Sequence, residues 1–239
     1  MAKLAVVCFL ASLFSRHEKS SGKLLQGFAI PMAIVGVLLA LIVFEVDLGT
    51  TALIGATTFV MMFIAGTNGV VLGVLSMMGV SAIIFVATMM PERLSRLTAF
   101  LNPEKSKLDA GLQQMQALIA WGSGGIDGLG LGNGRQKMLY LPYAHTDFIF
   151  PMIGEELGLR VSLLVVFLFS VIIGCGMMIA FHANNRLGLL LAAGSVSLLA
   201  LHAEFNIVGT TSLLLTSGSL PPFITYARSE PDVTLFGFC

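Results

Sequence analysis

The stretch from Val161 to Phe181 reads VSLLVVFLFSVIIGCGMMIAF and carries no charged residue. A helix needs about 20 mostly apolar residues to cross the hydrocarbon core of a bilayer, and this stretch is long enough to do so. Only 11% of the chain is charged and its mean hydropathy is +0.92, whereas an ordinary soluble domain carries roughly a quarter charged residues. The sequence therefore predicts an all-α membrane protein, because a helix satisfies its own backbone hydrogen bonds in lipid.

Further apolar stretches predict a polytopic transmembrane helix bundle, a single membrane domain over residues 1–239. The predicted spans are residues 3–14, 27–45, 51–67, 70–90, 159–181 and 187–208. The first of these is only a partial span, and its short apolar core after Lys3 also fits a signal peptide. Because the chain enters the membrane again directly afterwards, a short helix is the preferred interpretation.

The charges of the short loops predict which side of the membrane each loop faces. Between Ser15 and Lys23, three basic residues accompany one glutamate, which places this loop in the cytoplasm. Alternation of the spans then places the long segment 91–158 outside. This segment carries several basic residues, but long loops are translocated largely regardless of their charge.

The overall charge and the cysteines exclude several classes of function. The formal net charge is zero, which gives no argument for binding nucleic acid. Cys8, Cys175 and Cys239 are far apart in the sequence, and no Cys/His spacing of a metal site is present. A disulfide framework and a zinc site are therefore unsupported.

The long outer segment contains an amphipathic stretch followed by a run of glycines. Leu108, Leu112, Met115 and Ile119 recur at helical spacing; they predict a helix that lies at the membrane interface or caps a cavity, or one that packs over the bundle without a role of its own. The following run, GSGGIDGLGLGNGRQK at 122–137, matches neither a dinucleotide fingerprint nor a Walker A loop. It predicts a flexible loop.

Charged residues at the end of this run and after it suggest a site. Arg135 and Lys137 suit an anionic head group or a phosphate, although contact with ordinary lipid phosphates is the alternative. Asp147 precedes the apolar residues Phe148-Ile149-Phe150. A loop carboxylate is usually solvated or caps a turn, but desolvation at a membrane border would raise the pKa of Asp147 toward the range useful for a general base. The adjacent Glu155 and Glu156 are expected to point in different directions, one toward the bundle and one toward the interface.

Three runs of this segment together resemble a known family. GLQQMQALIAWGSGG, GLGLGNGRQK and YLPYAHTDFIFPMIGEELGL are similar to the large outer loop of the SEDS family, the membrane glycosyltransferases typified by FtsW, RodA and SpoVE. The similarity extends to AKLAVVCFLA at 2–11, DLGTTAL at 47–53 and LLLTSGSLPPFITY at 213–226. It is closer to the division type, FtsW, than to the elongation type.

The resemblance implies a fold, an activity and a set of partners. The fold is the SEDS helix bundle, here partial, with a large extracytoplasmic loop that contains interfacial helices. The activity is inverting polymerisation of lipid II into peptidoglycan strands at the outer face of the bacterial cytoplasmic membrane, in cell division or cell shape, with undecaprenyl diphosphate as leaving group. The partners are a class B penicillin-binding protein, which is a transpeptidase, and membrane proteins of the divisome or elongation complex. The sequence does not identify a cofactor, and a diphosphate substrate is compatible with Mg²⁺ or another divalent cation.

The resemblance also assigns roles to individual residues. Asp147 is the catalytic residue. The residues expected to bind substrate are Arg135, Gln136, Lys137, His145, Glu155, Glu156, Lys3 and Asp47. Lys3 and Asp47 match positions that face the central cavity of the family, and their alternatives are a lysine that snorkels to the interface and a helix cap.

The chain also departs from the family pattern. It begins at what would be the fourth span, it has Tyr143, Gly134 and Val46 where the family has glutamate, serine and proline, and its sequence diverges after Tyr226. We therefore expect a chain truncated at both ends, for which an inactive remnant or a scaffold is one alternative. A translocator of the lipid-linked precursor is another, with His202, Glu204 and Asn206 as a polar path; a structural role of His202 and Glu204 inside the bundle is the simpler interpretation.

Overall fold

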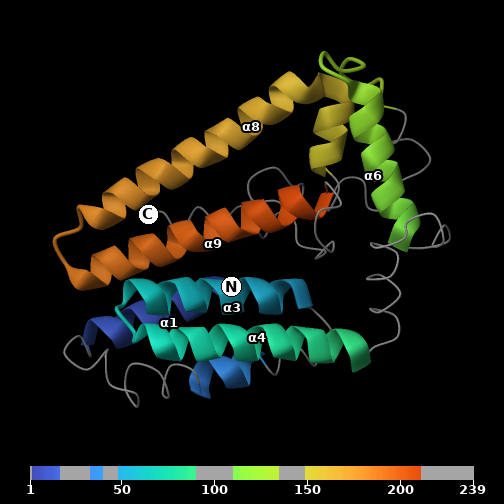
Figure 1. Cartoon of the computed structure of the whole chain (residues 1–239). Coiled ribbons are helices and arrows are strands. Elements are labelled where there is room, and N and C mark those ends of the chain that lie inside the picture. Colours follow the sequence, from blue (N-terminus) through green and yellow to red (C-terminus); the bar gives the residue numbers. More distant parts are fainter. Residues whose placement is uncertain (1, 17–32, 40–47, 90–109, 135–148, 211–239) are drawn as a thin grey trace. The chain divides into compact units, whose positions relative to one another are not determined.

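The computed structural model describes residues 2–16, 33–39, 48–89, 110–134 and 149–210 (Figure 1). Within these ranges the regular elements are helices, with turns between them and no strand. The helices are α1 (Ala2–Arg16), α3 (Leu48–Ile64), α4 (Gly69–Met89), α6 (Ala110–Gly124), α8 (Ile149–Phe181) and α9 (Arg186–Thr210), and residues 33–39 are also helical. The predicted all-α class is therefore confirmed.

The helices are distributed over two compact units. The first contains α1, α3, α4 up to residue 82, and the parts of α8 and α9 within residues 171–202. The second contains residues 83–89 of α4, α6, residues 149–170 of α8 and residues 203–210 of α9. The candidate site residues Glu155 and Glu156 belong to the second unit, whereas Lys3 belongs to the first.

The core of the first unit forms where α1, α3 and α9 meet. The face of α1 that packs against α3 is apolar at helical spacing; its buried members are Val6, Val7, Leu10, Ala11 and Phe14. Gly194 of α9 lies close to both α1 and α3. An added Cβ there would be 2.8 Å from Cγ1 of Val7 and 2.9 Å from Sδ of Met61. A small residue at a helix crossing lets the backbones approach closely, and Gly194 has this role here.

The turn between α3 and α4 is capped at both ends. Gly66 has a φ of 84°, and the N–H groups of Gly66 and Thr67 donate to the carbonyls of Phe63 and Met62, both at 3.1 Å. This is a Schellman motif, which satisfies carbonyls left open at a helix end. Oδ1 of Asn68 accepts a hydrogen bond of 3.0 Å from the N–H of Val70, at the start of α4. The two helices are thus joined by a turn with satisfied backbone groups.

Arg186, the first residue of α9, is tied to the end of α3. Its Nη2 donates to the carbonyl oxygen of Ala65 at 2.8 Å, a favourable place for a cation because the helix dipole is negative there. Replacing Arg186 by Met should remove this charge-assisted hydrogen bond and lower the free energy of unfolding by about 1.5–3 kcal/mol. Denaturant unfolding in detergent measures this loss, and Arg186→Lys, which keeps the charge, should lose less. Equal stability of wild type and Arg186→Met would contradict it.

Two helices in the described ranges are long and apolar enough to cross a membrane, namely residues Ile149–Phe181 and Arg186–Gly209. The predicted span 159–181 forms the C-terminal part of α8, and the helix also continues toward the N-terminus. The two parts are separated by a kink at Gly158, whose φ is 77° and ψ is 179°. Beyond the kink, large apolar side chains of α8 are exposed: Leu163, Leu164, Phe167, Leu168, Val171, Ile172, Met178, Ile179 and Phe181. Such a surface suits contact with lipid chains.

Candidate active site

The glycine run packs against the kink of α8 and forms what we name the glycine clasp, residues 124–134 together with residues 154–159. Three backbone hydrogen bonds join its two sides. They run from the N–H of Leu129 to the carbonyl of Glu155 at 3.0 Å, from Gly130 to Glu156 at 3.0 Å, and from Leu159 to Gly125 at 3.1 Å. The kink would otherwise leave the carbonyls of Glu155 and Glu156 without their helical partners. The loop therefore completes the backbone hydrogen bonding of the broken helix.

Glycine is required at the points where the two backbones touch. A Cβ on Gly158 would lie 2.5 Å from the nitrogen of Gly128 and from the oxygen of Ile126. A Cβ on Gly128 would collide with the carbonyl of Glu156, and one on Gly124 with the carbonyl of Gly154. The density of glycines predicted a flexible loop here. The structure instead gives residues 124–134 a defined path, because the glycines allow close backbone contact.

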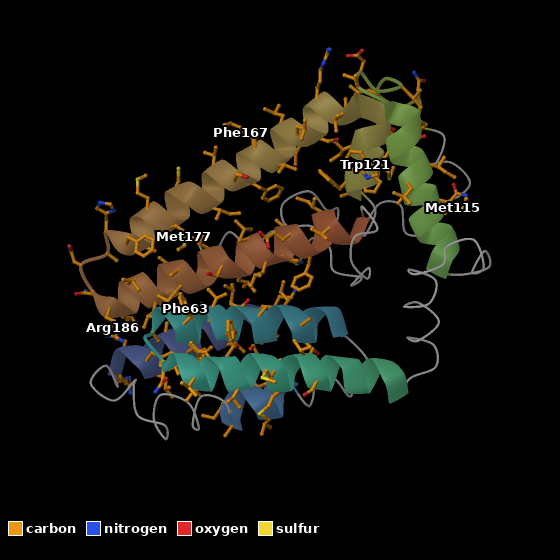
Figure 2. All side chains as sticks on the ribbon, in the orientation of Figure 1. Phe63, Met115, Trp121, Phe167, Met177 and Arg186 are labelled. Carbon is orange, nitrogen blue, oxygen red and sulfur yellow. The ribbon has the colours of Figure 1, made fainter. Side chains whose placement is uncertain are left out.

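An aromatic pair supports the clasp from the side of α6. Trp121 and Phe150 make an edge-to-face contact with ring centroids 5.2 Å apart and an interplanar angle of 66°. The indole covers Gly154, since a Cβ there would be 2.7 Å from Cε3 of Trp121. Figure 2 shows Trp121 between α6 and the N-terminal part of α8. These contacts fix α6 against the helical turn that carries the glutamates.

The buried face of α6 is not the apolar stripe predicted from its sequence. Ala117 and Ala120 are buried, whereas Met115 and Ile119 of the predicted apolar stripe are exposed. Small residues form the packed face because they allow α6 to approach the backbone of α8. The larger apolar residues remain available for another environment, as expected for a helix at an interface.

The glutamate pair, Glu155 and Glu156, lies against the end of the glycine run. Glu155 is only 1% exposed. A Cβ on Gly134 would be 3.0 Å from Oε1 of Glu156 and 3.2 Å from Oε2 of Glu155. Both carboxyl groups therefore reach the same residue, and the expectation that they point in different directions is wrong. The kink and the loop, rather than the helix alone, determine their directions.

The structure describes three of the predicted site residues. Glu155 and Glu156 lie together in the clasp, and Lys3 is half-buried near the N-terminus of α1 in the other unit. The remaining predictions fall outside the described residues; they are Asp47, Arg135, Gln136, Lys137, His145 and Asp147. The roles of all these residues stay predictions.

Two features of the glycine clasp were not predicted from the sequence. One is an ion pair between Nη1 of Arg160 and Oδ1 of Asp127, 2.7 Å apart, which bridges the two sides of the clasp. The other is the break at Gly158. The glycine that follows the glutamate pair in GEELG was the available signal for this break, because an isolated glycine in a helical pattern weakens the helix.

The glutamate pair offers oxygen atoms of the kind that Mg²⁺ binds. In the part of the chain that the structure describes, no group of three or more His, Cys, Asp or Glu side chains is arranged to hold a metal ion. The use of a divalent cation therefore stays a prediction.

The polar residues of α9 do not share one face. His202 and Asn206 are buried at an i, i+4 spacing, whereas Glu204 between them is exposed. A path for a polar head group would need all three to line the same surface. The burial of His202 and Asn206 instead suits polar groups with a structural role, with Glu204 on another side of the helix.

The chain matches a known protein family. The family model of the cell cycle proteins FtsW, RodA and SpoVE matches residues 1–237. The chain is 40% identical over 233 residues to a probable peptidoglycan glycosyltransferase FtsW of Coxiella burnetii, which covers 96% of this chain and 63% of that protein. It is 37% identical over 233 residues to the stage V sporulation protein E of Bacillus subtilis, covering 98% of this chain and 64% of that protein.

Among solved structures, the chain is similar to a chain from a peptidoglycan synthase complex that coordinates polymerization and crosslinking. The TM-score is 0.77 at 19% sequence identity, and the similarity covers 99% of this chain and 66% of that chain. This likeness shows the fold. The chain spans slightly less than two thirds of the length of the relatives that it matches. From the family match over residues 1–237, the chain is a membrane protein that belongs to the FtsW, RodA and SpoVE family.

Proposed function

We propose that this protein is a peptidoglycan glycosyltransferase that polymerises lipid II into glycan strands, in cell division or cell shape. The observation that carries the proposal is the 40% identity over 233 residues to a protein named probable peptidoglycan glycosyltransferase FtsW. The proposed site lies at the glycine clasp, because the segment 135–148 follows Gly134 in the sequence and directly precedes α8, which carries the glutamate pair. This segment contains the proposed base, Asp147, and the proposed phosphate ligands.

The proposed reaction is a single displacement at the anomeric carbon of the donor sugar. The carboxylate of Asp147 accepts the proton of the acceptor hydroxyl as its oxygen forms the new glycosidic bond. The bond from the anomeric carbon to the diphosphate breaks, and undecaprenyl diphosphate leaves with the electron pair. Because an α-linked donor gives a β-linked product, one base is enough and no carboxylate nucleophile is needed.

The leaving diphosphate needs positive charge, and two nearby residues in the sequence can supply it. Arg135 and Lys137 are one and three residues after Gly134, and Gly134 lies beside the glutamate pair. We propose that Glu155 and Glu156 hold these basic side chains in place, since a carboxylate accepts well-aligned hydrogen bonds from guanidinium and ammonium groups. Gln136 and His145 complete the proposed contacts with the sugar and the phosphates, and a divalent cation would assist at the diphosphate.

The location and partners follow from the same proposal. The basic loop 15–23 would lie in the cytoplasm, and the clasp would lie at the outer face of the bacterial cytoplasmic membrane in a multi-pass protein. The proposed substrate is lipid II. The proposed partners are a class B penicillin-binding protein, which crosslinks the strands, and membrane proteins of the divisome or the elongation complex.

The test is a polymerisation assay with the purified full chain and a class B penicillin-binding protein in lipid nanodiscs. Fluorescent lipid II should be converted into strands that separate as a ladder on a gel, with release of undecaprenyl diphosphate. A parallel assay in liposomes follows movement of fluorescent lipid II between the leaflets. Movement of lipid II without strand formation would show a translocator instead of a glycosyltransferase. A folded protein with neither activity would support a scaffold role.

A further inference from the structure

Three large apolar side chains are exposed on the loop side of the clasp. Ile126, Leu129 and Leu131 have exposed fractions of 60%, 39% and 77%. Water contact with three such side chains on one short loop is unfavourable, and clustered exposed apolar residues mark a surface that contacts a protein or a membrane. We name these three residues the loop tip.

The clasp holds the loop tip at the point where α8 becomes a membrane-crossing helix. Leu159 is the first residue after the kink, and Gly125 directly precedes Ile126. The N–H of Leu159 donates to the carbonyl of Gly125 at 3.1 Å. The N–H of Leu129 itself donates to the carbonyl of Glu155 at 3.0 Å. From Val161 onward α8 carries no charged residue and is largely exposed. The loop tip is therefore fixed to the end of the apolar span and not to a distant part of the loop.

The ion pair of the clasp indicates the depth of this point. Arg160, on the first turn of the span, contacts Asp127 of the loop at 2.7 Å, and their side chains are 73% and 76% exposed. A charged pair with this exposure belongs in water or among head groups, and an arginine at the end of a span extends its charged end to that level. Asp127 directly follows Ile126, so charged and apolar side chains of one loop occur at the same end of α8. This combination is typical of a membrane interface.

We propose that the loop tip inserts into the bilayer, among the upper acyl chains of the leaflet that α8 enters at Leu159. The occupant of this surface is phospholipid. Ile126, Leu129 and Leu131 contact the acyl chains, while Arg160 and Asp127 remain at the head groups. The insertion adds a second attachment of the clasp to the membrane, beside α8 itself, and holds the glutamate pair at a constant depth. The proposal depends on α8 crossing the bilayer and does not depend on the glycosyltransferase activity.

The test measures the depth of single labelled positions in the full chain. Cys8, Cys175 and Cys239 are replaced by serine, and a single cysteine at position 131 carries an environment-sensitive fluorophore. The protein is placed in phosphatidylcholine and phosphatidylglycerol liposomes that contain lipids spin-labelled near the head group or deep in the chain. Aqueous iodide is the opposing quencher. Matched labels at Phe167, exposed in the middle of α8, and at Asn184, exposed in the turn after α8, calibrate lipid and water.

We expect the shallow lipid quencher to act on position 131 several-fold more strongly than iodide, whereas the order is reversed at position 184. Iodide quenching at 131 equal to that at 184 would place the loop tip in water and overturn the proposal. Quenching by neither agent would place it under protein and also overturn it. Absence of lipid quenching at position 167 would show that α8 does not cross the bilayer, and this would also overturn the proposal.

A second pair of variants separates insertion from a loss of folding. With the label moved to position 126, Leu131→Asp should increase iodide quenching several-fold, because a carboxylate resists entry into the acyl chains. Leu131→Ile should leave the label at its original depth. The same iodide quenching in both variants would contradict insertion, and size-exclusion chromatography of each variant shows whether the fold is retained.

Discussion

Replacement of Asp147 by asparagine should reduce the rate of lipid II polymerisation at least about 100-fold, the lower end of what a general base contributes. The asparagine amide has nearly the size of the carboxylate but cannot accept the proton of the acceptor hydroxyl. Substrate binding should change much less than the rate, because the proposed phosphate contacts belong to Arg135 and Lys137. The rate of strand formation at saturating lipid II is therefore the quantity to compare.

The matched control for this prediction is Asp127→Asn, which removes a carboxylate from the neighbouring loop. Asp127 is exposed and forms an ion pair with Arg160, and exposed ion pairs contribute at most about 1 kcal/mol. This variant should polymerise lipid II at close to the wild-type rate. If Asp147→Asn retained the rate of this control, Asp147 would not be the base.

Replacement of Gly158 by alanine should open the glycine clasp. The φ of 77° and ψ of 179° belong to a region that is essentially restricted to glycine and costs other residues about 1–3 kcal/mol. The new Cβ would also lie 2.5 Å from backbone atoms of Gly128 and Ile126, which cannot move without displacing the loop. Strain and collision together should cost about 3 kcal/mol or more and break the hydrogen bonds between the two sides.

Hydrogen exchange of the backbone amides measures this opening. The amides of Leu129, Gly130 and Leu159 donate across the clasp, and their exchange should accelerate on the order of 100-fold, because each 1.4 kcal/mol is a factor of ten. Gly174→Ala is the matched control in the same helix, since nothing lies within 4 Å of a Cβ at that position. Unchanged protection of these amides in Gly158→Ala would show that the clasp tolerates a side chain.

The bounds of several helices could be predicted because apolar residues are continuous over a whole span. The predicted range 70–90 and the observed helix α4, Gly69–Met89, cover nearly the same residues. Helix α8 is different: its residues 149–157 contain Pro151 and two glutamates, so hydropathy alone marks only the part after Gly158. The helical turns before the kink are stabilised by Trp121 and by the loop, and these are tertiary contacts that no local pattern contains.

The candidate site was predictable in composition but not in arrangement. The glutamate pair and the glycine run were both identified from their residue types. That they contact each other depends on hydrogen bonds between Leu129 and Glu155 and between Gly130 and Glu156, which join residues distant in sequence. Glycine density indicates either a flexible backbone or a closely packed one, and only the partner backbone distinguishes them. The same partner explains why both carboxylates reach Gly134.

The clasp also has a consequence for the chain between its two sides. The residues between positions 130 and 156 lie between the two sides of the clasp in the sequence, so the hydrogen bonds of the clasp close a ring of chain and its entropy of closure is spent when they form. That entropy grows only slowly with ring size, by about 0.6 kcal/mol for each doubling of a flexible loop. The length and sequence of the ring can therefore vary at small thermodynamic cost while its two ends stay at the same place. The helices of the fold therefore do not constrain the length of this segment.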